Sequence, residues 1–119
     1  NKGFKIIGID NGNPAVENAA IYFQGNHTGA KIIGNEIVAN GDAGLMTEYS
    51  ASISNFVIEG NIFSGKTFLG SNPGGYGFSQ QFTLPNVPRQ LVVIGGGASG
   101  TNTTNIEFRN NLVNGTAGG

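Results

Sequence analysis

The chain has 119 residues, of which 21 are glycine, none is cysteine and only 11% are charged, with a formal net charge of −1. A composition this poor in charge and this rich in glycine excludes a disordered polyelectrolyte and argues against a helical protein. The six basic residues are scattered and form no basic face for a phosphate backbone, so we expect no nucleic-acid partner.

The lack of cysteine also removes disulfides, thiolate zinc sites and cysteine nucleophiles. No apolar run approaches the roughly 18 residues of a transmembrane helix, so we expect no membrane span. The length suits a single module over residues 1–119. Because the chain starts at Asn1 and not at Met, we expect either a removed leader or a segment of a longer protein.

Short strands separated by polar corners follow one another along the first half of the chain. Residues 4–9 form the first expected strand, and the Asn-Gly-Asn-Pro sequence at 11–14 turns the chain. Residues 15–18 could form a single helical turn. Residues 20–23 are expected to be a strand that ends at the Gln-Gly-Asn corner of residues 24–26.

The next strand, residues 30–38, contains the sequence Lys-Ile-Ile-Gly-Asn-Glu-Ile, in which a Gly-Asn corner interrupts an apolar run. An Asn-Gly-Asp turn is expected at residues 40–42. Residues 44–49 then form a strand at the position in their repeat that residues 20–23 occupy one period earlier. Residues 56–63 then repeat the Gly-Asn strand. The chain therefore consists of short strands without helical crossovers, which excludes βαβ units.

The repeats have a nearly constant spacing. Lys5 and Lys31 are 26 residues apart, as are Asn35 and Asn61, whereas Asn61 and Asn111 are 50 apart, close to two periods. A β-sandwich would fit the strand lengths, but it would not return the same tripeptides at a fixed interval. A parallel β-helix does so because like residues stack on successive coils.

In a parallel β-helix, aliphatic and aromatic side chains at equivalent positions would stack inside at about 4.8 Å per coil. One expected stack is Ile6, Ile32, Ile58 and Phe108, and a second is Ile37, Phe63 and Val113. Three asparagines are expected to form a structural ladder at the corner, because Asn tolerates the left-handed conformation and stacked amides can hydrogen-bond along the axis: Asn35, Asn61 and Asn111.

Residues 64–89 break the repeat and are rich in glycine, proline and aromatic residues. We interpret this stretch as a long lateral excursion that rejoins the wall at residues 90–94, and loops of this length are usually functional or interfacial. Its aromatic residues could contact a ligand or another chain, or could cover the wall as a local core: Phe68, Tyr76, Phe78 and Phe82.

Residues 31–45, with their Gly-Asn corner, Asn-Gly turn and small-Gly-aliphatic strand, resemble the repeat of the right-handed parallel β-helix superfamily, the pectin-lyase-like proteins. The resemblance covers roughly residues 3–63 and 90–115. It implies a right-handed coil, and the four repeats predict an all-β solenoid of about four such coils. We expect the chain to belong to an extracellular or cell-surface protein. The superfamily includes polysaccharide lyases, hydrolases and epimerases, but also tailspikes, adhesins and non-catalytic surface proteins.

Enzymes of this superfamily need a base together with acids or Ca²⁺ to neutralise a uronate. Lys66, Arg89, Glu48 and Tyr49 could meet on one wall as catalytic residues, although chance charges on a solvated wall explain them as well. The calcium-binding aspartate runs of the lyases and the clustered aspartates of the hydrolases are absent. A Ca²⁺ ion would fit best at Asp42, but its glycine-rich frame does not repeat, so we expect no metal or cofactor.

Two other motifs have a structural explanation. The sequence Gly95-x-Gly97-x-x-Gly100 matches the dinucleotide fingerprint, but the polar stretch after it is a poor helix former, so we interpret it as a corner. His27 is the only histidine and lies at an expected exposed turn. It belongs to an Asn-x-Thr triplet that recurs at residues 102–104 and 114–116 and has the form of a glycosylation sequon.

Three hypotheses follow from these observations. The first is a non-catalytic structural module that acts by stacking on further coils or on copies of itself, as a filament or oligomer. The second is part of a polysaccharide lyase, hydrolase or epimerase. The third is glycan binding through the aromatic excursion.

Overall fold

The computed structural model describes residues 3–9, 18–41, 43–67, 91–95 and 98–117. Over these ranges the chain is all-β, with no helix that could cross a membrane. Every strand pair is parallel. The expected all-β, parallel architecture is confirmed, and a sandwich built from antiparallel hairpins is excluded for the described strands.

The strands form three parallel sheets. The first sheet contains β1 (Lys5–Ile7), β5 (Glu36–Gly41), β8 (Ile62–Thr67) and β11 (Leu112–Ala117) in that order. The second sheet contains β2 (Ala19–Phe23), β6 (Ala43–Thr47) and β9 (Val92–Val93). In the third sheet, β7 (Ile53–Glu59) lies between β10 (Thr103–Arg109) on one side and both β3 (His27–Thr28) and β4 (Lys31–Ile33) on the other.

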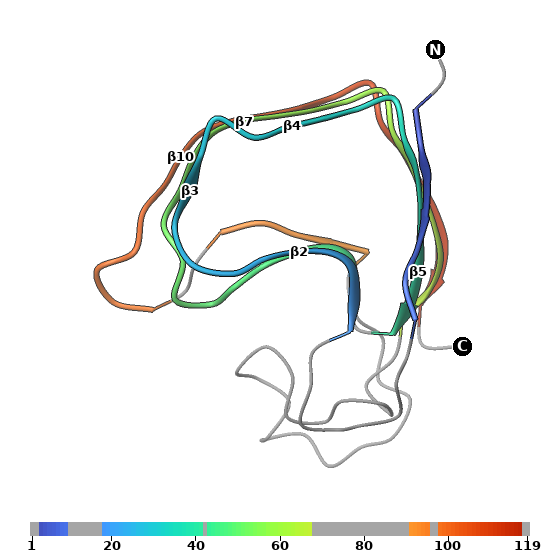
Figure 1. Cartoon of the computed structure of the whole chain (residues 1–119), viewed down its shortest axis with the longest axis horizontal. Coiled ribbons are helices and arrows are strands. Elements are labelled where there is room, and N and C mark those ends of the chain that lie inside the picture. Colours follow the sequence, from blue (N-terminus) through green and yellow to red (C-terminus); the bar gives the residue numbers. More distant parts are fainter. Residues whose placement is uncertain (1–2, 10–17, 42, 68–90, 96–97, 118–119) are drawn as a thin grey trace.

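The chain visits the three sheets in a fixed order. It runs from the first sheet to the second and then the third, repeats this order twice more, and returns to the first sheet with β11. Figure 1 shows successive passes following nearly the same course, for example β4, β7 and β10 along one side. Each strand of one pass therefore pairs with its equivalent in the next pass.

The register confirms most of the two expected stacks. Ile58 pairs with Ile32 on one side and Phe108 on the other, and Phe63 pairs with Ile37 and Val113 through the first sheet. The placement of Ile6 was wrong, because Ile6 faces Ile37 and not Ile32. Lys5 pairs with Glu36. The sequences starting at Lys5 and Lys31 are therefore similar in their residues, but they lie in different sheets and are not equivalent in the repeat.

The 50-residue interval was also misread as two periods. Strand β10 pairs directly with β7, and β11 pairs directly with β8, so these 50 residues make a single pass with an insertion. Residues 64–67 belong to β8 and not to the excursion. Strand β9 falls within the expected return at 90–94. Residues 68–90, which hold most of the excursion, and residues 15–17 of the expected helical turn lie outside the described ranges.

Apolar side chains of the middle pass fill the interior. Ile37, Leu45, Ile58 and Phe63 are buried in one cluster with Ile32. A second cluster joins buried residues of the third sheet and its preceding corner: Ala51, Ile53 and Phe56. Inward residues would normally alternate along a strand, but Ile53 and Phe56 are three apart and both buried.

The left-handed conformation of Asn55 between them accounts for this change of phase (φ 57°). Asn105 has the same conformation at the equivalent position of β10, and Gly29 has it between β3 and β4 (φ 53° and 79°). Asn and Gly are the residues that adopt this conformation at low cost. The third sheet therefore bends at the same place in every pass, with its residues before and after the bend facing the same interior.

Candidate functional site

Of the four residues considered for catalysis, the structure describes the side chains of Glu48 and Tyr49 only. The Glu48 carboxylate is half-buried and accepts a hydrogen bond from the Gly25 N–H (2.6 Å). Tyr49 follows it in a turn and is 38% exposed. The backbone of Lys66 lies in β8, whereas its side chain and all of Arg89 fall outside what the structure describes. The predicted grouping stays a prediction.

The same holds for the aromatic residues proposed to contact a ligand or another chain. Phe68, Tyr76, Phe78 and Phe82 lie within residues 68–90, outside the described ranges. Asp42, where Ca²⁺ was considered, also lies outside them. Within the described ranges, no group of three or more acidic or histidine side chains is placed to hold a metal ion.

The asparagine ladder at the corner before the first sheet has the geometry expected from the sequence. The Asn61 side-chain oxygen accepts hydrogen bonds from the backbone N–H (2.9 Å) and the amide (3.3 Å) of Asn35. The Asn111 oxygen accepts the equivalent bonds from Asn61 (2.9 and 3.1 Å). Asn61 is fully buried, so these bonds satisfy polar groups that would otherwise be costly to bury.

The same amides also tie the corner to the third sheet. Asn61 Nδ2 donates to the Ile32 carbonyl (2.8 Å), and Asn111 Nδ2 donates to the Ile58 carbonyl (2.9 Å). The left-handed bend lies one residue earlier than expected, at Gly34, Gly60 and Asn110 (φ 70°, 66° and 54°). The asparagines therefore serve as hydrogen-bonding residues, and the residues before them make the bend.

The ladder ends differently on its two sides. Phe4 occupies the position of the asparagine in the first pass, because Lys5 pairs with Glu36. Its backbone N–H donates to Asn35 Oδ1 (3.0 Å), but its side chain offers no amide to a preceding strand. At the other side, Asn111 has an amide but no further strand of the described chain beyond it.

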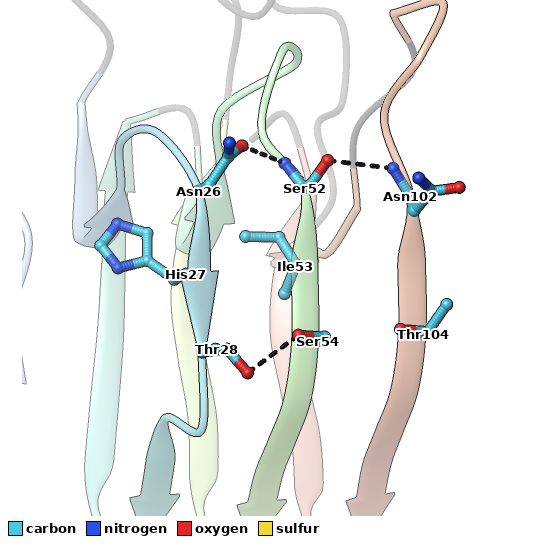
Figure 2. Close-up of a pocket in the computed structure, with 8 residues that line it drawn as sticks. All are labelled: Asn26, His27, Thr28, Ser52, Ile53, Ser54, Asn102 and Thr104. Atoms are coloured by element: carbon cyan, nitrogen blue, oxygen red, sulfur yellow. Dashed lines mark hydrogen bonds between the residues drawn. The ribbon is translucent and has the colours of Figure 1, made fainter.

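A polar face on the outside of the third sheet is the clearest surface feature (Figure 2). Two columns of polar side chains cross the three passes and line an open pocket of about 320 Å³, together with His27 and Ile53. The first column is Asn26, Ser52 and Asn102, and the second is Thr28, Ser54 and Thr104. We call these six residues the outer polar face.

Hydrogen bonds between passes occupy several groups of the outer polar face. The Asn26 oxygen accepts from the Ser52 N–H (2.7 Å), and the Ser52 hydroxyl accepts from the Asn102 N–H (3.2 Å). The Ser54 hydroxyl donates to the Thr28 hydroxyl (2.9 Å). Figure 2 shows these three bonds running across the strands, so the same side chains that face solvent also hold adjacent passes together.

The outer polar face was not predicted from the sequence. Its signal is a polar-x-hydroxyl triplet at residues 26–28, 52–54 and 102–104, with the spacing of 26 and 50 residues that the asparagine corner also has. Two of these triplets were noticed only as sequons. His27 is exposed, as expected, and its Nε2 lies 2.9 Å from the Gln24 carbonyl oxygen.

Charged side chains on the surface form ion pairs, both between neighbouring passes and within β10. Lys5 pairs with Glu36 (3.2 Å) beside a second pocket at the asparagine corner. Arg109 pairs with Glu59 (3.1 Å) and Glu107 (3.0 Å), and the hydrogen bond to Glu59 is the main cause that raises the pKa of Arg109. The stabilising contribution of a base with a raised pKa is lost only when the pH rises above that pKa. Arg109 therefore stays positively charged in this pair throughout the neutral range.

The glycine-rich corner has no helix after it. Residues 98–100 form a bend and turn, and β10 begins at Thr103, so the described chain lacks the helix N-terminus that would hold a pyrophosphate. The Gly95 N–H instead donates to the buried hydroxyl of Thr47 (2.8 Å). This agrees with the interpretation of the motif as a corner between strands.

The comparisons with known proteins give no relative: no family model, no curated protein and no solved structure matches this chain. Function must therefore be argued from the residues themselves. In the described ranges, most buried or partly buried polar side chains bond to the next pass. What this arrangement can do chemically is hold parallel strands in register and present a polar wall to solvent.

Proposed function

We propose that the chain is a non-catalytic structural module of a right-handed parallel β-helix, in an extracellular or cell-surface protein, which acts by stacking coils and by self-assembly. The observation that carries the proposal is the asparagine ladder. Its three amides bond to one another and to the third sheet (2.8–3.3 Å), so each coil is built to receive another.

The order of strands supports a β-helix. The chain returns to the same three sheets in the same order, and each return pairs with the pass before it. A chain that winds in this way, with like residues above like, is the arrangement of a solenoid. The right-handed sense comes from the resemblance to pectin-lyase-like proteins, and the count of about four coils comes from the repeats in the sequence.

Both ends of the stack favour assembly. Solenoids normally need caps because their terminal strands leave backbone donors and acceptors unpaired. Here large apolar side chains are exposed at both ends, including Phe4 (79%) on the side of β1 and Val113 (50%) on the side of β11. Such side chains favour the addition of further coils, from the same protein or from a copy.

Assembly is tested by sedimentation velocity over a hundredfold range of protein concentration. We expect the sedimentation coefficient to rise with concentration. A coefficient that stays at the monomer value over the whole range would contradict self-assembly.

A polysaccharide-active or glycan-binding function is the alternative, and the outer polar face is the observation that favours it. Hydroxyl and amide groups in two columns can hydrogen-bond a sugar chain lying along the wall, and Asn102 and Thr104 are exposed there. Catalysis would also need a base, for which Lys66 and Arg89 are the candidates in this sequence.

The two functions are separated by assaying depolymerisation of uronate polysaccharides. We expect no release of unsaturated or reducing ends from the natural chain, and no difference between it and the Lys66→Ala and Arg89→Ala variants. Product release that either substitution abolishes would overturn the structural proposal in favour of an enzyme.

A further inference from the structure

The first sheet is one layer longer than the other two. Its four strands lie side by side from β1 to β11, whereas the second sheet has three strands, and in the third sheet β3 and β4 share one side of β7. A second copy stacked head to tail with its β1 in place would leave a gap of one strand in two sheets. Without that β1, the copy would begin with β2, β3, β4 and β5, which are the strands that the next coil requires.

We propose that β11 of one copy displaces β1 of a second copy and pairs with its β5, so that β1 is a removable cover on the edge that joins copies. The proposal rests on the proposed function and names both the partner and the strand that gives way. In this junction β9 pairs with β2 of the next copy, β10 with β3 and β4, and β11 with β5. Each pairing uses the register that the chain has between its own passes.

Strand β1 is held by few contacts. It pairs with three residues of β5, Glu36 to Val38, whereas β8 pairs with all six on the other side. Within β1 only Ile6 is half-buried, and Phe4 before it is 79% exposed. The ion pair between Lys5 and Glu36 lies at the surface, where such pairs contribute little. Displacing β1 therefore uncovers little apolar surface of its own.

Strand β11 is suited to replace it. It has six residues, as β5 does, and in the register of the first sheet Val113 takes the position of Ile6. Val113 would face Ile37 of the next copy, as Phe63 faces Ile37 within the chain. Ile37 would stay covered, and Val113, which is 50% exposed in a single copy, would gain a neighbour on its open side.

The asparagine ladder runs through this junction without a break. Asn111 takes the position of Phe4, whose side chain has no amide. At each ladder position the backbone N–H donates to the side-chain oxygen in the next pass, so the Asn111 N–H would donate to Asn35 of the next copy. The Asn35 amide would in turn donate to the Phe108 carbonyl, as the other two ladder amides donate to the third sheet within the chain.

The third sheet matches in the same junction. Phe108, which is 43% exposed, would face Ile32 of the next copy, as the fully buried Ile58 does within the chain. Glu107 would face Lys31 of the next copy, because both are register partners of one residue of β7. Lys31 is exposed and has no ion pair within the described ranges. Junctions of this head-to-tail kind form rings or open filaments.

A disulfide between β1 and β5 tests whether β1 has to leave. The chain has no cysteine, Ile7 and Val38 are register partners, and paired strands lie about 4.8 Å apart, which a disulfide can span. We expect oxidised Ile7→Cys/Val38→Cys to lose the association that the natural chain shows by sedimentation velocity, and a reductant to restore it. Val38→Cys/Ser64→Cys is the matched control, because it joins β5 to β8 and leaves β1 free to move. It should associate equally when oxidised and reduced.

A second pair of cysteines reports where β11 lies. In the proposed junction Asn114 faces Val38 of the next copy, whereas within one chain β8 separates them by about 10 Å, too far for a disulfide. Oxidised Asn114→Cys/Val38→Cys should therefore form disulfide-linked oligomers, identified by peptide mapping. The matched control is Asn114→Cys/Ile7→Cys, which is positioned to link copies when β11 pairs with a β1 still in place. We expect this control to stay unlinked.

The outcomes separate this inference from the proposed function. If the natural chain associates and oxidised Ile7→Cys/Val38→Cys associates equally well, or if Asn114→Cys links with Ile7→Cys and not with Val38→Cys, then β1 stays in place and the displacement is wrong while self-assembly stands. If the natural chain and the reduced variants stay monomeric at every concentration, both the inference and the proposed self-assembly are overturned. Far-ultraviolet circular dichroism checks that each variant is folded.

Discussion

The inner strands β7 and β8 and the edge strands β10 and β11 have similar residues at equivalent positions, yet these residues differ sharply in burial. Ile58 and Phe63 are fully buried, whereas their register partners Phe108 and Val113 are 43% and 50% exposed. Strands β7 and β8 have a neighbouring strand on both sides, whereas β10 and β11 have one on one side only. For these inward-facing positions, burial is therefore set by the number of neighbouring strands, and the stabilising contribution of a residue should follow it.

The largest difference should come from truncating a core side chain in each pass. Phe63→Ala removes a fully buried ring that stacks on Phe108 (centroids 6.0 Å apart), and we expect a loss of about 3–5 kcal/mol in the free energy of unfolding. Val113→Ala, its half-exposed register partner, should cost about 1 kcal/mol or less. Urea denaturation measures both. Equal losses would show that the two passes are equally covered.

The next effect concerns the asparagine ladder. Asn61→Ala removes a buried amide that bonds Asn35, Asn111 and the Ile32 carbonyl, and we expect a cost of about 3 kcal/mol. Asn35→Ala should cost about 1 kcal/mol, because the bond that its oxygen accepts, from the Phe4 N–H, is exposed. Thermal and urea unfolding of the two variants give this comparison. A larger loss for Asn35→Ala would contradict the assigned geometry.

The smallest effect isolates the bend before the ladder. Gly60 has φ 66° and open space where a side chain would begin, so Gly60→Ala should cost about 1 kcal/mol for conformational reasons alone. Gly60→Asn should cost less, because Asn110 occupies the equivalent position in the last pass with φ 54°. If both substitutions destabilise the chain equally in urea, the bend does not have the left-handed conformation.

The sequence was most informative where local chemistry and position coincide. Asn35, Asn61 and Asn111 were predicted as a ladder because a buried corner in a repeat needs a residue that can bond to its own copies, and that geometry is present. The Ile32–Ile58–Phe108 stack followed from the same repeat. Both predictions depend only on which residues recur, and this can be read directly from the sequence.

Predictions failed where register depends on the whole sheet. The Lys-Ile-Ile-Gly sequence starting at Lys5 is similar to the one starting at Lys31, but Lys5 pairs with Glu36 because β1 belongs to another sheet. The 50-residue interval was divided into two periods because an insertion and an extra coil have the same length in sequence. The outer polar face was missed because its triplets share only polarity and not identity.

Hydrogen exchange read by mass spectrometry tests most directly that the middle pass is held from both sides. Amides of β7 donate to both neighbours, as in the bonds from Val57 to the Ala30 carbonyl (2.9 Å) and from Ile53 to the Asn102 carbonyl (2.9 Å). At a protein concentration where the chain is monomeric, we expect β5 and β7 to exchange most slowly and β10 and β11 much faster. Equal protection of β7 and β10, or slower exchange in β10, would contradict the arrangement of passes described above.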